Sequence, residues 1–450
     1  MKPRPPFMHR ESGSVLIVVM VVCLGLVSIT LLLGNSVIMG YRASDNELAG
    51  READMAIEGA AQYAEEIMAS GTQPGAVPDP TTYQAEDVTV GNAAFWFIGE
   101  PAQGASTTTP AFGLVDEASK LNLNTASATM LMNLPGMTQD LAQAIVSWRS
   151  ANTNATTESS AETGASASSS EKNGPFETVE ELAAVNAGTD LLTLYGNDTN
   201  LNHVLDPDET AGGSSGLAPG LLEYVTVYSR EPNTLPNGTQ RINITTYSIP
   251  LLQLLLTTFG PSRGAQLSRR IRRAGPVRSV LEFYIKSTMT PTEFAQISPM
   301  LTMSNGPYTT GLINVNSASQ TVLECVPGIN ATTAAQIVST RQGQTTPVTN
   351  LSWVAQILGP AASIQAGPYL TAETFQISAD VAAVGHHGRG YRRTLFVIDG
   401  STGTPQIVFR RNLSALGWAL GSDARQLLAS QQQQGSTGPL GGNNLGGKAQ

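Results

Sequence analysis

The sequence predicts an α+β fold in which a long N-terminal helix packs on a small antiparallel sheet, with compact helical modules inserted between the strands. Three observations predict it. An apolar run near the N-terminus continues without a proline into an alanine-rich helical segment. Strand-like runs follow that helix and return near the C-terminus. Between these strands, one 29-residue helical motif occurs twice.

The composition excludes several classes of protein. A length of 450 residues allows several domains, and charged residues make up only 13%. The formal net charge of −10 argues against a general nucleic-acid binder, which needs lysine and arginine in excess to neutralise phosphates. The two cysteines, Cys23 in the apolar run and Cys325 in the soluble part, exclude a disulfide framework.

The N-terminus predicts a membrane anchor. No charged residue occurs between Glu11 and Arg42, and Val15 to Leu33 is almost wholly apolar. A helix of that length spans the hydrocarbon core of a bilayer. A short basic leader precedes it, but the apolar run is too long for a secretory signal and no small-x-small cleavage site ends it.

The soluble part begins with the continuation of this helix. Alanines recur at helical spacing at positions 49, 53, 56, 60 and 64, which predicts one rod about 85 Å long. Strand-like runs occur at 87–90, 94–98, 112–115, 222–228, 374–384, 393–399 and 406–411. The Gln- and Gly-rich tail and the Ser/Thr/Ala tract at 151–174 predict disorder.

The internal repeat predicts a helix-hairpin-helix or SAM-like module. Residues 121–149 and 313–341 align without a gap and share 13 identities. Each copy has Asn-x-Asn, an Ala-Ser helix start, a Pro-Gly hairpin and a second helix that ends in arginine. The hairpins are Pro135-Gly136 and Pro327-Gly328. A degraded copy without Pro-Gly begins at Ile242.

A segment of the first module predicts a calcium loop. Residues 198–209 match the twelve-residue EF-hand pattern, in which spaced oxygen atoms converge on one cation. The predicted ligands are Asp198, Asn200, Asn202, the carbonyl of Val204, Asp206 and Glu209. The sixth position needs positive φ and carries His203 where glycine is usual. The alternative is an Asx-rich turn with a capping aspartate.

Other candidate sites are weaker. DNA-binding hairpins of this type use Gly-x-Gly amides to hold a phosphate, but here Thr138 and Asn330 replace the second glycine. Six arginines lie between Arg263 and Arg278, which favours a solvated or protein-binding face over DNA contact. His386 and His387 read as a solvated hairpin turn. No nucleophile, base and cleft combine, so we expect no enzyme.

These motifs together resemble the minor pseudopilin K (GspK) family of bacterial type II secretion systems. Gly13-Ser14, between a basic leader and the apolar helix, resembles a type IV prepilin signal. The resemblance implies cleavage after Gly13 by a prepilin peptidase, with Ser14 as the mature N-terminus. Val18 then takes mature position five, where most pilins carry glutamate and K-type pseudopilins do not. LVDEASKLNLNTA and GLINVNSA are the most specific matches.

The resemblance implies a pilin-like fold with inserted modules, and the following division of the chain. We expect a leader at 1–13, a transmembrane helix at 14–34, its soluble continuation at 35–70, pilin-like strands at 71–118, a first module at 119–216, a strand and linker at 217–240, a degenerate module at 241–311, a third module at 312–372, C-terminal strands at 373–420 and a disordered tail at 421–450.

The implied function is mechanical. A K-type pseudopilin caps and initiates the pseudopilus that drives protein export across the outer membrane. It is held in the inner membrane by a single pass, with its soluble part in the periplasm. The implied partners are the I-, J- and H-type minor pseudopilins, the major pseudopilin and the prepilin peptidase, and no nucleic acid. Two rivals stay open: a membrane-anchored, competence-type DNA-binding protein and an uncleaved inner-membrane scaffold.

Overall fold

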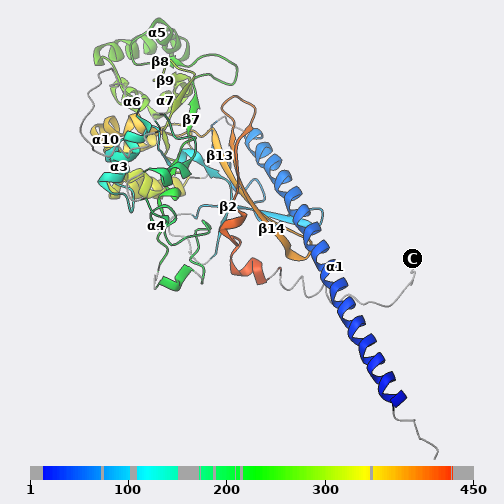
Figure 1. Ribbon diagram of the computed structural model, residues 1–450. Coiled ribbons are helices and arrows are strands. Elements are labelled where there is room, and N and C mark those ends of the chain that lie inside the picture. Colours follow the sequence, from blue (N-terminus) through cyan, green and yellow to red (C-terminus); the bar gives the residue numbers. More distant parts are fainter. Residues whose placement is uncertain are drawn as a thin grey trace, which may run out of the picture.

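The computed structural model describes residues 14–71, 75–101, 109–150, 172, 174–185, 189–207, 209–212, 216–344, 348–426 and 428. The predicted leader with Gly13, most of the predicted disordered tract and the tail beyond residue 428 lie outside the described residues. Figure 1 shows a long helix, a sheet against its second half and a larger helical head at the end of the molecule away from the helix start.

The long helix, α1, spans Ser14–Ala69 and is about 84 Å long at 1.5 Å per residue. It forms as one element because no proline interrupts these 56 residues. From Ala49 to Ala64 its alanines are buried, which lets the helix backbone approach the sheet closely. The predicted single rod is therefore confirmed.

The sheet is antiparallel throughout. Its main path has the order β1-β2-β13-β14-β15, and two short strands join it: β3 pairs with β2, and β4 pairs with β13. The strands are β1 (Val88–Val90), β2 (Ala93–Gly99), β3 (Ala111–Phe112), β4 (Val115–Asp116), β13 (Gln376–Gly385), β14 (Arg389–Asp399) and β15 (Gln406–Asn412). The first and last parts of the chain thus build one sheet, as predicted, and everything between them is inserted.

Two sequence predictions about strands need correction. The run at 112–115 is two strands, because Gly113 and Leu114 break it and each half pairs with a different neighbour. The run at 222–228 is mostly not a strand. Leu221–Glu223 forms a 3-10 turn (η4), and only β6 (Val225–Thr226) pairs with another segment.

Each face of the sheet has its own core. On one face, α1 packs through alanines and Ile57 against Phe95 and Phe97 of β2 and against apolar residues of β13 and β14. On the opposite face, Trp96 and Ile98 pack against Ala419, Leu420 and Leu428. The predicted disordered tail therefore starts too early, because Leu428 is only 6% exposed.

Three helical modules leave and re-enter the sheet region through short parallel bridges. The bridges are β5 (Leu121–Asn122) with β6, β8 (Ile242–Asn243) with β9 (Leu301–Thr302), and β11 (Ile313–Asn314) with β12 (Leu370–Thr371). Each therefore pairs an apolar-Asn dipeptide with an apolar-Thr dipeptide. Because the two ends of each module lie side by side, a whole module can be inserted without disturbing the sheet.

The modules repeat one helical arrangement and share one core. A serine precedes the first helix of each module, and its side chain caps that helix; these residues are Ser127, Ser248 and Ser319. The helices are α2 (Ala128–Leu131), α3 (Gln139–Arg149) and α4 (Leu191–Tyr195) in the first module; α5 (Ile249–Ala274), α6 (Val280–Ser287) and α7 (Pro291–Ile297) in the second; and α8 (Gln320–Glu324), α9 (Ala331–Gln342) and α10 (Ser352–Ala366) in the third.

Shorter elements complete the head. The strands β7 (Arg230–Pro232) and β10 (Tyr308–Thr310) pair with each other between the modules. The 3-10 turns are η1 (Glu117–Ser119), η2 (Val179–Ala184), η3 (Glu209–Gly212), η5 (Ser298–Met300), η6 (Gly367–Tyr369), η7 (His386–Gly388) and η8 (Ser414–Leu416). The first module closes at Thr226, ten residues beyond its predicted end, because its bridge strand lies in the predicted linker.

Candidate functional site

The first half of α1 is a bare apolar surface. The large apolar side chains from Val15 to Met39 are between 49% and 73% exposed, and Val18 lies among them at 60%. This is the only helix in the described part of the chain that is long and apolar enough to cross a membrane. Ser14 is its first residue. A surface of this kind is stable in a lipid bilayer or against other apolar helices, and not in water.

An ion-pair cluster holds α1 to the sheet at the point where the exposed half of the helix ends. His386 of η7, in the β13–β14 hairpin, contacts Asp45 (Nε2–Oδ1, 2.9 Å) and Glu52 (Nδ1–Oε2, 2.6 Å). Arg389 also pairs with Asp45. The histidine is 14% exposed, so the predicted solvated turn is wrong for His386.

The charges in this cluster support one another. Hydrogen bonding by His386 lowers the pKa of Asp45, and the backbone N–H of His386 lowers the pKa of Glu52. Burial lowers the pKa of His386, but its hydrogen bonds to Asp45 and Glu52 outweigh this effect and raise it. The sequence held no sign of the cluster, because more than 330 residues separate its partners.

The two predicted Pro-Gly hairpins form, and the second module has a helix break at the corresponding place. Gly136 and Gly328 adopt the positive φ values of +72° and +88° that a tight helix-to-helix turn requires. The hairpin at Gly328 packs against α10, where a Cβ atom would meet the carbonyl oxygen of Ala362. In the degenerate copy, Gly260-Pro261 breaks α5 and replaces the Pro-Gly hairpin.

The arginines that end the second helices are internal clamps. The guanidinium of Arg149 donates to the carbonyls of Leu123 and Ala126. Arg341 donates to the corresponding carbonyls of Val315 (3.1 Å) and Ala318 (2.6 Å). Both arginines hold the turn between bridge strand and first helix. Since these guanidinium groups are engaged internally, they are poor candidates for contacts with phosphate.

The predicted calcium ligands come together in one loop whose first asparagines and aspartate are buried. Asp198, Asn200 and Asn202 are 1%, 7% and 0% exposed. Asp198 accepts the backbone N–H groups of Asn202 (3.1 Å) and His203 (2.7 Å), which bends the loop around its carboxylate. His203 has φ +61°, as the sixth position of an EF-hand loop requires. The Asn200 and Asn202 side chains donate to Oδ2 of Asp206.

The same loop contains features that a cation would satisfy. The buried Oδ1 of Asn200 has no hydrogen-bond partner among the described residues. Burial raises the pKa of Asp198 to about 6, although the hydrogen bond from the backbone N–H of His203 lowers it in part. Glu209 accepts the N–H groups of Thr199 (2.7 Å), Asn200 (3.2 Å) and Asp206 (3.1 Å). In the described structure, however, no three His, Cys, Asp or Glu side chains are grouped closely enough to hold a metal, so amide and carbonyl oxygens must contribute.

A buried arginine fastens this loop to the sheet. Arg393 of β14 is 0% exposed, and its guanidinium donates to both carboxylate oxygens of Asp380 (2.9 and 2.6 Å). It also donates to the carbonyl of Asn200 and to that of Leu201 (2.9 Å). On the same side, the Asn200 amide donates to the carbonyl of Trp418 (3.1 Å). The loop is therefore attached to both the sheet and the C-terminal segment.

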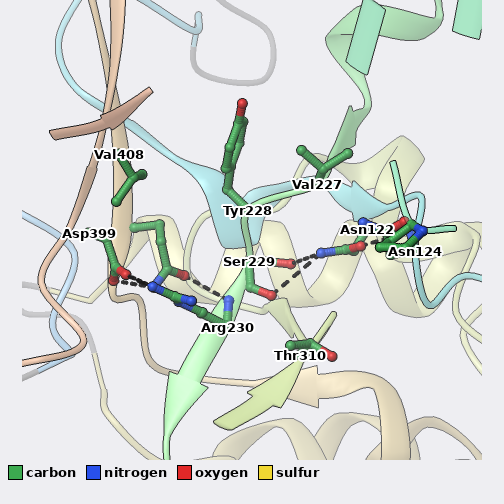
Figure 2. A pocket seen from close by; sticks show the side chains of 11 residues that line it. Asn122, Asn124, Val227, Tyr228, Ser229, Arg230, Thr310, Asp399 and Val408 are labelled. Atoms are coloured by element: carbon green, nitrogen blue, oxygen red, sulfur yellow. Dashed lines mark hydrogen bonds and ion pairs between the residues drawn. The ribbon is translucent and has the colours of Figure 1, made fainter. Parts of the chain in front are cut away.

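A cavity of about 400 Å³ lies where the first module and the β7–β10 pair meet the sheet. Figure 2 shows two pairs among the side chains that line it: Arg230 extends toward Asp399, and Ser229 lies next to Asn122. The Arg230 Nε–Asp399 Oδ2 distance is 3.1 Å, and the Asn122 Nδ2–Ser229 Oγ distance is 3.0 Å. The polar groups that line the cavity are largely hydrogen-bonded to one another. They therefore connect parts of the chain and offer few free groups to a ligand.

A group of ion pairs, largely shielded from solvent, lies beside this cavity. Arg241 lies between Glu373 (Nη2–Oε2, 2.9 Å) and Glu231 (Nη1–Oε2, 3.8 Å), so one cation serves two carboxylates. Oε1 of Glu231 has no partner among the described residues. Burial, followed by repulsion from Glu373, raises the pKa of Glu231 to about 7.

Glu231→Gln is expected to stabilise the protein at pH 8 and to have little effect at pH 5. The folded pKa of Glu231 is above its ordinary value of 4.5, so the folded state binds the extra proton. This contribution to stability is complete below about pH 4.5 and is lost as the pH rises through 7. Urea unfolding should show a gain of about 1–2 kcal/mol at pH 8. Glu47→Gln, at an exposed carboxylate, is the control; a gain that does not change with pH would contradict this account.

Of the comparisons with known proteins, the family match agrees with the helix-hairpin-helix interpretation of the first module. Residues 116–157 match the family described as the helix-hairpin-helix motif. No curated protein matches the sequence. Among solved structures, the chain is similar to a chain of the GspK-GspI-GspJ complex from the type 2 secretion system of enterotoxigenic Escherichia coli. The identity is 8% and the TM-score 0.33, over 83% of this chain and 99% of that chain.

Proposed function

We propose that this protein is a K-type minor pseudopilin that caps and initiates a secretion pseudopilus by assembly and not by catalysis. The observation that carries the proposal is the structure of α1. It is a single helix whose first half is exposed and apolar and whose second half packs against the sheet. Such a helix transfers a folded head from a membrane into a helical bundle without unfolding, because both environments bury the same apolar surface.

The proposal explains the features at both ends of the helix. After cleavage between Gly13 and Ser14, residue Val18 takes the position at which a glutamate would bind the N-terminal ammonium of a neighbour. A subunit without that carboxylate needs no neighbour above it. The head, enlarged by three inserted modules, would also obstruct further stacking. Both properties suit a subunit at the tip.

The proposed partners follow from this position. The bare half of α1 would pack against the corresponding helices of the I-, J- and H-type minor pseudopilins and of the major pseudopilin. The prepilin peptidase would remove the leader. The chain would be held in the inner membrane by residues 14–34 until assembly, with its head in the periplasm.

Co-expression with the other minor pseudopilins tests this function. The full chain, extracted in detergent, is expected to co-purify with the I- and J-type proteins. Ile29→Asp, which places a charge on the bare apolar surface, should abolish the complex, whereas Glu47→Gln should preserve it. A chain that purifies alone, or a complex that survives Ile29→Asp, would contradict the proposal.

We also propose that loop 198–209 binds calcium. Asp198, Asn200, Asn202, Asp206, Glu209 and the carbonyl of Val204 would hold the ion. The positive φ at His203 and the unpartnered Oδ1 of Asn200 support this set. A divalent cation would neutralise the buried carboxylates and secure the loop that Arg393 attaches to the sheet.

Calcium is expected to raise the thermal stability of the full chain, and chelator to lower it. At a calcium concentration about 100 times the Kd, the gain is about 2.7 kcal/mol. Asp198→Ala should abolish the response. Asp190→Ala, which removes an exposed helix cap in the same module, should leave the response intact. An unchanged melting temperature of the wild type in chelator would end the calcium proposal.

DNA binding is the second candidate, because the helix-hairpin-helix match favours it. In this case a short duplex would be retained on a filter together with the protein, and retention would fall steeply as salt rises. Binding that is weak at low salt and insensitive to the hairpin residues would set this candidate aside.

A further inference from the structure

An unbalanced group of arginines covers one side of the second module. We call Arg269, Arg270, Arg272, Arg273 and Arg278 the arginine surface; all five are exposed. They lie on the last two turns of α5 and in the segment before α6. Figure 1 places α5 at the far end of the head from the N-terminal end of α1. The surface is therefore remote from the part of the molecule that would enter a membrane.

The arginines point away from the core because of their spacing. Gly264, Leu267, Ser268 and Ile271 are the buried residues of this half of α5. At 3.6 residues per turn, the four arginines from 269 to 273 fill an arc of about 160° on the opposite side. Two have weak internal contacts: Arg272 lies 5.3 Å from the Tyr247 ring, and Arg270 bonds Thr288.

The positive charge is local and uncompensated. Residues 241–311 contain eight Lys and Arg but only two Asp and Glu, a net charge of +6 in a chain whose total is −10. Both acids already have partners: Glu282 pairs with Lys286 and Glu293 with Arg263, each at 2.7 Å. Within the described ranges, no carboxylate pairs with the arginine surface. By contrast, Arg51, Arg392 and Arg410 each pair with a carboxylate.

Helix stability does not account for the arrangement. Cations in the last turn are favoured by the helix dipole, which explains one or two of the arginines. However, Arg269 lies three and four residues before Arg272 and Arg273, and like charges at these spacings repel. An anionic partner would offset this repulsion. Its carboxylates could each accept two hydrogen bonds from one guanidinium group.

We propose that the arginine surface is a docking site for the acidic surface of a protein partner. Every cation in it is arginine, which protein interfaces contain more often than the rest of the surface does, whereas they contain lysine less often. A DNA duplex fits less well. It would extend beyond the module onto a remainder whose net charge is −16, the difference between −10 and +6. The nearby hairpin contains Pro261, which has no N–H to offer a phosphate.

A labelled peptide rich in glutamate, about 16 residues long, is the probe, and the full chain in detergent is the protein. Fluorescence anisotropy at low salt is expected to show binding that weakens as salt rises. Replacing Arg269, Arg272 and Arg273 by Gln should weaken it at least about tenfold. The control replaces Arg51, Arg392 and Arg410 by Gln. It makes the same change in net charge at paired arginines and should stay within about twofold of wild type.

Three results would overturn the proposal. The peptide could fail to bind the wild type at low salt. The two triple variants could weaken binding equally, which would reduce the effect to net charge. A DNA duplex or anionic lipid vesicles could bind more tightly than the peptide and depend on the same three arginines, which would assign the surface to another class of ligand. Circular dichroism of both variants establishes that they are folded.

Discussion

Arg393→Met is expected to lower the free energy of unfolding by about 3–5 kcal/mol, because it leaves the largely buried carboxylate of Asp380 without its cation. Asp380 would lose two hydrogen bonds, and the carbonyls of Asn200 and Leu201 would each lose one. Methionine fills much of the volume but offers no donor. The loop at 198–209 would then be free of β14, so the stabilisation by calcium should also fall. Urea unfolding with and without calcium measures both effects.

Arg410→Met is the matched control. Arg410 lies on the neighbouring strand β15 and pairs with Glu58 of α1, but both side chains are about half exposed. Pairs of this kind contribute about 0–1 kcal/mol. If the two variants lost equal stability, or if Arg393→Met responded to calcium as the wild type does, the proposed attachment of the loop would be wrong.

Gly390→Ala is expected to cost about 2–4 kcal/mol, because two separate constraints meet at this residue. Its φ is +68°, which an L side chain rarely adopts. A Cβ atom here would also overlap the backbone of Ala49 and Gly50, where the β13–β14 hairpin meets α1. The substitution should therefore weaken the contact between α1 and the β13–β14 hairpin.

Gly403→Ala separates the two constraints. Gly403, between β14 and β15, has φ +87° but open space around its Cβ position, so only the backbone strain of about 1–2 kcal/mol should appear. Urea unfolding of both variants gives the difference. Equal losses would show that the close approach to α1 contributes nothing to stability.

Local patterns were sufficient to predict the longest elements of this fold and the repeated features of two modules. Uninterrupted alanine spacing predicts α1, and strand-like runs near the C-terminus predict the three long C-terminal strands. The repeat predicts the serine caps, the Pro-Gly turns and the terminal arginines of two modules. These properties depend on residues a few positions apart, so the sequence displays them directly.

The connections between elements could not be predicted in this way. The Asp45–His386 contact joins residues 341 positions apart, and Arg393 reaches a loop more than 190 residues earlier. The third helical break was missed because Gly260-Pro261 reverses the expected order of residues. The loop at 198–209 falls between these cases. Its EF-hand-like spacing could be recognised in the sequence, whereas its attachment to Arg393 and Trp418 could not.

The mass of the mature N-terminus tests the account most directly. The protein should be purified at its native level from cells with an active prepilin peptidase, and its N-terminal peptide identified by mass spectrometry. The account predicts a chain that begins at Ser14 with an N-methylated amine. A chain that keeps Met1 and its basic leader would contradict it and leave an ordinary tethered protein.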